Sequence, residues 1–139
     1  MRLVRLIYAS TIIRPYEGST IEDILSSARN NNKLNDVTGL LCFNRKYFLQ
    51  CLEGSRRAVN RIYGELMADP RHEDLVLLSY EDVDQRDFLQ WEMGYVSENS
   101  ITRELTLRYS SSSDFNPYDL NKESVHRLLL SLRDHVPVI

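Results

Sequence analysis

The order of periodic segments constrains this fold more than any other feature of the sequence. Leu3–Ala9 is apolar on both alternating faces except at Arg5, which is typical of a central strand. Ser19 and Glu22 then fit a capping box, in which each side chain satisfies a free backbone N–H. The stretch Ile21–Ala28 places apolar side chains at i, i+3, i+4 and i+7, so we expect a helix with one core-facing stripe.

A hairpin and a second strand-helix unit follow. Val37–Phe43 and Tyr47–Glu53 are predicted strands, and the turn residues 44–46 join them. Gly54-Ser55 then caps a second helix with the same apolar spacing as the first. We expect that helix to end at Asp69-Pro70, because the residue before a proline avoids helical geometry.

Two further strands, Leu75–Tyr80 and Trp91–Val96, complete the order βαββαββ. This order predicts an α+β fold, a ferredoxin-like sandwich with a mixed five-stranded sheet. Right-handed crossovers place the two long helices on one face of the sheet. In that arrangement the first and third strands lie side by side at its centre.

The remaining chain predicts an extension to the sandwich. We divide the sequence into a domain at 1–97 and a helical extension at 98–139. The extension contains a short helix at Ile101–Tyr109, a serine-rich linker, and an amphipathic helix from Asn121 to His135. The apolar stripe of the last helix has two possible uses, either packing on the free sheet face or joining subunits.

Composition excludes several classes of function. The chain has 139 residues and a net charge of −3, which argues against nucleic acid as the main partner. No apolar run approaches the roughly 20 residues of a membrane span. Cys42 and Cys51 provide neither a metal motif nor a disulfide framework, so we expect no metal site and a reducing, cytoplasmic compartment.

Polar residues at positions where the periodicity demands apolar ones are informative, because burying an unpaired polar group costs about 1–3 kcal/mol. Asn32 falls within about 20° of Ile21 on the helical wheel, and Asn31 falls at the edge of the same stripe. Gln50 and Tyr8 lie on otherwise apolar strand faces. Each has an ordinary structural explanation: a helix-capping asparagine, a core glutamine satisfied by backbone, or a core tyrosine.

The predicted topology brings these four polar side chains together. Tyr8 and Gln50 lie on adjacent strands, and the first helix covers the same face, among Ile24, Phe48 and Leu66. A mostly apolar slot with a few placed amides suits a flat, neutral heteroaromatic ring rather than a phosphate or a metal.

Two other groups of residues are candidates. Asp69, Arg71 and His72 follow the second helix in a loop, where Arg71 is able to meet a phosphate by bidentate hydrogen bonds. A solvated surface cluster is the alternative. Trp91 and Met93 are expected to share one face of the last strand, either as simple core residues or as part of the site.

Several segments together resemble the BLUF family of blue-light sensors that use flavin. They are RLIYAS, IEDIL with Asn31-Asn32, VTGLLCF, FLQCLEG, ADPRH and WEMGYV, and the resemblance covers roughly residues 1–97. The short extension resembles the stand-alone, PixD-type members.

The resemblance implies a non-enzymatic photoreceptor with a non-covalently bound flavin, FAD or FMN. It implies that Tyr8 donates an electron and a proton, and that Gln50 bridges Tyr8 to the ring and rearranges. The other implied contacts are Asn32 at the ring edge, Asn31 toward the pyrimidine side or the tail, and Asp69, Arg71 and His72 near the phosphate tail. Ile24, Phe48 and Leu66, which surround the predicted slot, are the expected apolar contacts of the ring. Trp91 and Met93 match the strand that relays the signal.

The resemblance also implies a ring-type homo-oligomer and a response-regulator-like protein partner. Without the resemblance, the residues themselves leave two alternative functions open. An acylphosphatase-like hydrolase needs an anion-holding loop after the first strand, where this chain has Arg14 and the single glycine Gly18. A metabolite-binding regulatory module of the same fold is the other alternative.

Overall fold

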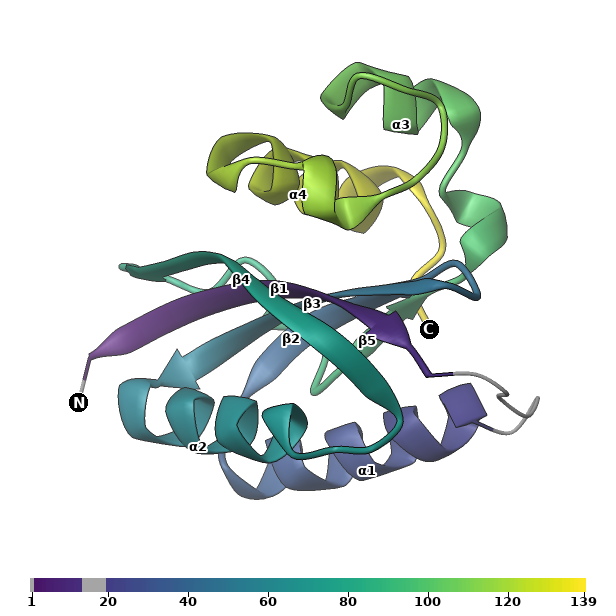
Figure 1. The fold of residues 1–139 in the computed structure, drawn as a ribbon. Coiled ribbons are helices and arrows are strands. Elements are labelled where there is room, and N and C mark those ends of the chain that lie inside the picture. The colour runs from purple at the N-terminus through teal and green to yellow at the C-terminus, as the bar shows by residue number, and fades with distance from the viewer. Residues whose placement is uncertain (1, 14–19) are drawn as a thin grey trace.

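The computed structural model describes residues 2–13 and 20–139. The predicted capping box at Ser19 and the loop with Arg14 and Gly18 lie outside these residues. Figure 1 shows a sheet between two layers of helices. Its elements are β1 (Leu3–Ile12), α1 (Thr20–Leu34), β2 (Thr38–Phe43), β3 (Tyr47–Ser55), α2 (Arg56–Met67), β4 (His72–Asp82), β5 (Gly94–Val96), α3 (Arg103–Tyr109) and α4 (Lys122–His135), with short 3-10 turns at Glu98–Ser100 and Pro117–Asp119.

The five strands lie in the order β4-β1-β3-β2-β5. β1 is antiparallel to both β3 and β4, whereas β2 is antiparallel to β3 and parallel to β5. The sheet is therefore mixed, and β1 lies beside β3 as the strand order predicts. This register places Tyr8 directly opposite Gln50.

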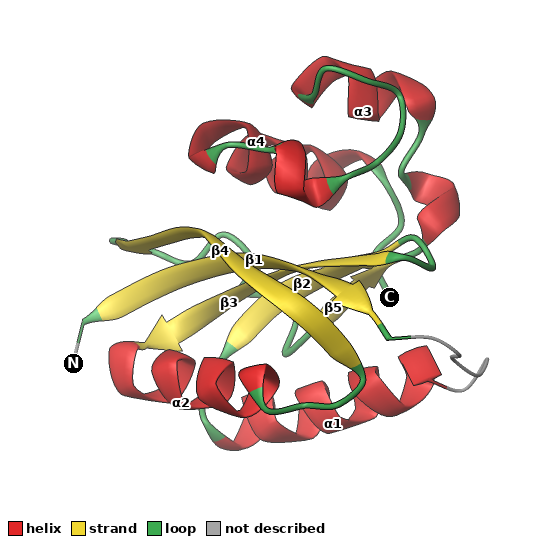
Figure 2. Cartoon of the chain, viewed as in Figure 1, coloured by secondary structure: helices red, strands yellow, loops and turns green. Residues whose placement is uncertain are grey.

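The two faces of the sheet are covered by different helices (Figure 2). α1 and α2 pack on one face, as predicted from right-handed crossovers. α4 packs on the other face and buries its apolar stripe there, with Val125, Leu128, Leu129 and Leu132 at most 1% exposed. Of the two uses expected for the apolar stripe of the last helix, the structure shows the first: the stripe packs on the sheet face that α1 and α2 leave free.

The last predicted strand is shorter than expected. β5 begins at Gly94, so Trp91 and Met93 precede it in an irregular segment. Met93 belongs to the core under α1 and α2, whereas Trp91 packs against the core under α4. The expectation that these two side chains share one face is wrong, because a period of two applies only within a strand.

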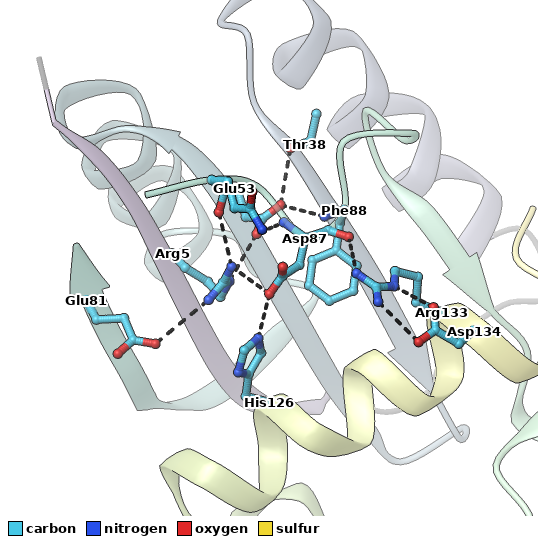
Figure 3. A network of polar contacts seen from close by, with 10 residues as sticks. Arg5, Thr38, Glu53, Glu81, Asp87, Phe88, His126, Arg133 and Asp134 are labelled. Carbon is cyan, nitrogen blue, oxygen red and sulfur yellow. Dashed lines mark hydrogen bonds and ion pairs between the residues drawn. The ribbon is translucent and has the colours of Figure 1, made fainter. Parts of the chain in front are cut away.

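Buried charges lie where β1 and β3 meet α4 (Figure 3). Arg5, the polar exception in the first strand, contacts Glu53 at 3.0 Å and Asp87 at 2.7 Å. Glu53 is fully buried and also accepts hydrogen bonds from the backbone amides of Asp87 and Phe88, at 2.8 and 2.9 Å. One carboxylate therefore anchors the segment after β4 to the sheet.

We expect Glu53→Gln to lower the free energy of unfolding by about 3–5 kcal/mol, because breaking a buried ion pair leaves Arg5 undercompensated. Urea denaturation measures this change. Arg2→Ala is the control, since it removes an ion pair with Asp82 in which Arg2 is 70% exposed and so costs less than about 1 kcal/mol. Equal losses in the two variants would contradict the role assigned to Glu53.

Within residues 2–13 and 20–139, no helix has both the length and the apolar character that a membrane crossing requires.

Candidate functional site

A cavity opens between the sheet and the two helices α1 and α2. The space inside it is about 670 Å³ when the open solvent at its mouth is counted. Its lining comes from β1, α1, β2, β3, α2 and the start of β4: Tyr8, Ile24, Ser27, Ala28, Asn31, Asn32, Leu41, Phe48, Gln50, Ile62, Glu65, Leu66, Asp69, Arg71 and His72.

The cavity brings together the residues that the sequence suggested as cofactor contacts, whereas Trp91 and Met93 are not part of its lining. Side chains predicted from the apolar faces, from the polar exceptions and from the segment after α2 all line it. Ser27, Ala28, Leu41, Ile62 and Glu65 also line it and were not predicted. Ala28 and Ile62 belong to the apolar stripes of their helices, so spacing alone indicated a buried face without marking a cavity.

Tyr8 and Gln50 form the polar centre of this cavity. The Tyr8 hydroxyl donates a hydrogen bond to Oε1 of Gln50, and both residues are at most 3% exposed. Nε2 of Gln50 lies 3.5 Å from the sulfur of Met93, which is a weak acceptor. The Gln50 amide therefore has a strong partner on one side and the capacity to donate to a better acceptor on the other.

The environment of Tyr8 holds its hydroxyl in the neutral form. Burial raises the pKa of Tyr8 far above its usual value, and the nearby Tyr63 and Asp69 raise it further. The rings of Tyr8 and Tyr63 have their centroids 5.5 Å apart. Tyr8 is therefore a proton donor throughout the ordinary pH range.

The two asparagines on α1 differ in position. Asn32 is 1% exposed, and its Nδ2 donates to the backbone carbonyl of Glu92 in the segment before β5. Asn31 is exposed at the mouth of the cavity. Asn32 lies in the last turn of α1, and its buried amide links this helix to the segment that carries Met93.

The residues after α2 form a preorganised polar rim. Arg71 binds both carboxylate oxygens of Asp69, with Nη2 to Oδ2 at 2.6 Å. Burial opposes ionisation of Asp69, but the hydrogen bonds and charge of Arg71 lower its pKa overall. The guanidinium is thus held at the cavity mouth by a partner within the chain.

His72 does not lie in the loop where the sequence analysis placed it. It begins β4 and is 8% exposed, so its assignment to a loop is wrong. Its Nε2 lies 2.7 Å from the carbonyl of Leu66, and its Nδ1 lies 2.8 Å from the hydroxyl of Ser10. Since a carbonyl only accepts, Nε2 carries a hydrogen that it donates to Leu66.

The chemistry of the lining fits a planar, neutral heteroaromatic ring. Apolar side chains form the walls, and the amides of Gln50 and Asn32 offer donors and acceptors at one edge. Within residues 2–13 and 20–139, no group of three or more His, Cys, Asp or Glu side chains is placed to hold a metal ion.

Comparison with known sequences identifies related light sensors. The family model named BLUF, described as sensors of blue-light using FAD, matches residues 3–94. The blue light- and temperature-regulated antirepressor BluF of Escherichia coli K12 is 40% identical over 86 residues, which are 62% of this chain and 21% of that protein. A photoactivated adenylate cyclase subunit beta of Euglena longa is 28% identical over 100 residues, 71% of this chain and 12% of that protein. The chain spans about a fifth or less of these curated relatives.

Comparison with solved structures extends the similarity over more of the chain. The photo-activated state of BlsA superimposes with a TM-score of 0.87 at 33% identity, covering 94% of each chain. The dark-state structure of BlrB, a BLUF protein, gives a TM-score of 0.76 at 28% identity and covers 94% of this chain and 96% of that chain. Because these matches cover more than nine-tenths of the chain, they include most of the segment after β5.

We expect Tyr8 to stay un-ionised while the protein is folded. A raised folded-state pKa means that the hydroxyl contributes stability that is complete below about pH 10 and is lost as the pH rises further. Alkaline titration followed by phenolate absorbance should give the same curve for the folded wild type and for Tyr8→Phe. If folded Tyr8→Phe formed one phenolate fewer than the folded wild type, Tyr8 would ionise in the folded protein, and the raised pKa would be wrong.

Proposed function

The chain belongs to the BLUF family of blue-light sensors, and from this premise we propose that its cavity holds a flavin, FAD or FMN, whose hydrogen bonds change under blue light. The observation that carries the proposal is the buried contact from the Tyr8 hydroxyl to Oε1 of Gln50 inside a mostly apolar cavity. No specific observation favours the hydrolase or the metabolite-binding alternative.

The photochemistry begins at the Tyr8 hydroxyl. Bound flavin supplies absorption of blue light and an excited ring that accepts an electron. Tyr8 provides that electron and releases its hydroxyl proton toward Gln50, to which it is already hydrogen-bonded. Both return to Tyr8 afterwards, and the Gln50 amide is left rotated or tautomerised, with a changed hydrogen bond to the ring. The residues thus form a switch between two hydrogen-bond states.

The remaining lining residues bind and orient the flavin in this proposal. Asn32 and Asn31 contact the polar edge of the ring, and the buried position of Asn32 beside Gln50 supports its role. Ile24, Phe48 and Leu66 form the walls. Asp69, Arg71 and His72 lie near the ribityl chain and its phosphate, a role supported by their place at the rim.

Met93 and Trp91 relay the change toward the rest of the molecule. The contact of the Met93 sulfur with Nε2 of Gln50 supports Met93 as the first residue to respond. Trp91 packs on the opposite side of the sheet, against the core under α4. The relay therefore uses the two sides of one short segment rather than one strand face.

Further parts of the proposal concern the whole protein. We assign flavin binding to residues 1–97 and output to 98–139, without catalytic turnover. The output partner is a response-regulator-like protein, and the assembly is a ring-type homo-oligomer, which the half-exposed Val76 and Leu77 on the edge strand β4 support. A cytoplasmic location is supported by Cys42 and Cys51, which are free, buried thiols.

We expect the purified protein to be yellow, with visible absorption that shifts red under blue light and recovers in darkness. One absorption spectrum before and after illumination measures this shift. A preparation that stays colourless after incubation with FMN and FAD would refute the proposed function.

We expect Tyr8→Phe and Gln50→Leu to retain flavin and lose the red shift, because each removes one member of the hydrogen-bonded pair. Difference spectroscopy on flavin-loaded protein measures the loss. Tyr63→Phe is the matched control and should keep the shift, since the Tyr63 ring packs beside Tyr8 while the hydrogen-bonded pair consists of Tyr8 and Gln50. A normal photocycle in Tyr8→Phe would exclude the donor role. Unfolding of Gln50→Leu, seen by circular dichroism, would instead indicate a core glutamine.

We expect Arg71→Gln to weaken binding of FMN by roughly 10- to 100-fold, because a hydrogen bond to a charged group contributes about 1.5–3 kcal/mol. Riboflavin lacks the phosphate and should bind both proteins equally, which makes it the matched control ligand. Flavin fluorescence quenching measures both affinities. An equal loss for riboflavin would place Arg71 against the ring rather than the phosphate.

A further inference from the structure

The last residues of the chain extend the sheet beyond β5. Tyr95 donates its backbone N–H to the carbonyl of Ile139 at 2.7 Å, and Ile139 donates back to the Tyr95 carbonyl at 3.1 Å. Residues that exchange both hydrogen bonds form an antiparallel pair. Figure 1 shows this end of the chain beside β5, the edge strand of the sheet. Residues 137–139 therefore cover an edge that would otherwise be open.

Val138 fits closely against β5. A Cβ atom placed on Gly94 would lie 2.6 Å from Cγ1 of Val138, so the absence of a side chain at Gly94 makes this approach possible. Val138 is partly buried against the core under α4. The docking thus combines one backbone pair with one small apolar contact.

Arg29 on α1 ties this docked segment to the cavity. Its Nε donates to the carbonyl of Met93 at 3.0 Å, and its Nη2 donates to the carbonyl of Ile139 at 2.8 Å. Met93 in turn contacts the Gln50 amide through its sulfur. A single guanidinium therefore joins the residue beside the photochemical pair to the end of the chain.

The body of α4 is held by different contacts. His126 pairs with Asp87 at 2.7 Å, Arg133 donates to the Asp87 carbonyl at 2.9 Å, and the apolar stripe of α4 is buried. None of residues 136–139 is fully buried, and Ile139 is 72% exposed. Regions with few buried contacts open at low free energy while the rest of the fold stays closed.

Rearrangement of Gln50 acts directly on Met93. In the observed state Nε2 of Gln50 faces the Met93 sulfur. If the amide turns, its oxygen replaces that nitrogen, and a thioether has no hydrogen to donate to an oxygen. The sulfur contact is then lost, and Met93 has to shift relative to its neighbours.

We propose that Arg29 is a positioning residue that makes the docking of residues 137–139 on β5 depend on the place of Met93, so that light releases this segment and uncovers the β5 edge. This inference rests on the proposed function. In this proposal the Gln50 switch controls whether residues 137–139 are docked on β5. The helix α4 stays in place.

Amide hydrogen exchange under dark and lit conditions tests the proposal. In the wild type, the amides of Tyr95 and Ile139 should exchange roughly tenfold faster in the light, because their mutual pair opens. In Arg29→Gln they should exchange fast in the dark already, with no further gain in the light. The flavin red shift should be retained in this variant, because Arg29 does not line the cavity.

Arg133→Gln is the matched control. Arg133 donates to the Asp87 carbonyl in the segment between β4 and β5, which is the segment that Arg29 also contacts, but the Arg133 bond does not involve Ile139. It should keep the light-dark difference at Ile139. A wild type with a normal red shift and equal exchange in light and dark would overturn the inference while leaving the proposed function intact. A light-dark difference that persists in Arg29→Gln would also overturn it. Absence of the red shift in the wild type would overturn the proposed function and this inference together.

Discussion

The antiparallel pairing of β1 with β3 places Tyr8 opposite Gln50 in the interior of the molecule, and the rest of the site depends on it. Because side chains alternate along a strand, a one-residue slip between β1 and β3 would turn one of the two groups toward α4 and leave Tyr8 and Gln50 on opposite faces of the sheet. The buried ion pair between Arg5 and Glu53 joins the same two strands on the opposite face. The register of one strand pair thus supports the hydrogen bond at the cavity and the charge cluster behind it.

The irregular segment between β4 and β5 connects the two sides of the sheet. Glu53 holds its beginning through the amides of Asp87 and Phe88, while Asn32 and Arg29 on α1 hold the carbonyls of Glu92 and Met93 at its end. A segment held by α1 at one end and by the sheet and α4 at the other is suited to pass a local change across the sheet. Besides these attachments, the backbone amide of Gly39 in β2 donates to the carbonyl of Trp91 at 3.1 Å.

Much of the cavity could be predicted because its polar residues interrupt regular apolar patterns. Tyr8, Asn32 and Gln50 each occupy a position that the periodicity reserves for a hydrophobic side chain, and all three line one cavity. Trp91 and Met93 could not be placed, because alternation has meaning only if the segment is a strand. Leu41 carried no signal at all, since an apolar strand residue beside a cavity looks the same as one in a filled core.

The sequence by itself determined the element order, the two helices on one face, and which polar groups had to find partners, because hydrophobic periodicity and the cost of burying polar atoms act locally. Only the tertiary structure decided where the segment before β5 runs, that α4 covers the second face, and that Arg29 reaches Met93 and Ile139 together. These outcomes depend on contacts between residues far apart in the chain. No local pattern encodes them, because they result from how the complete layers pack.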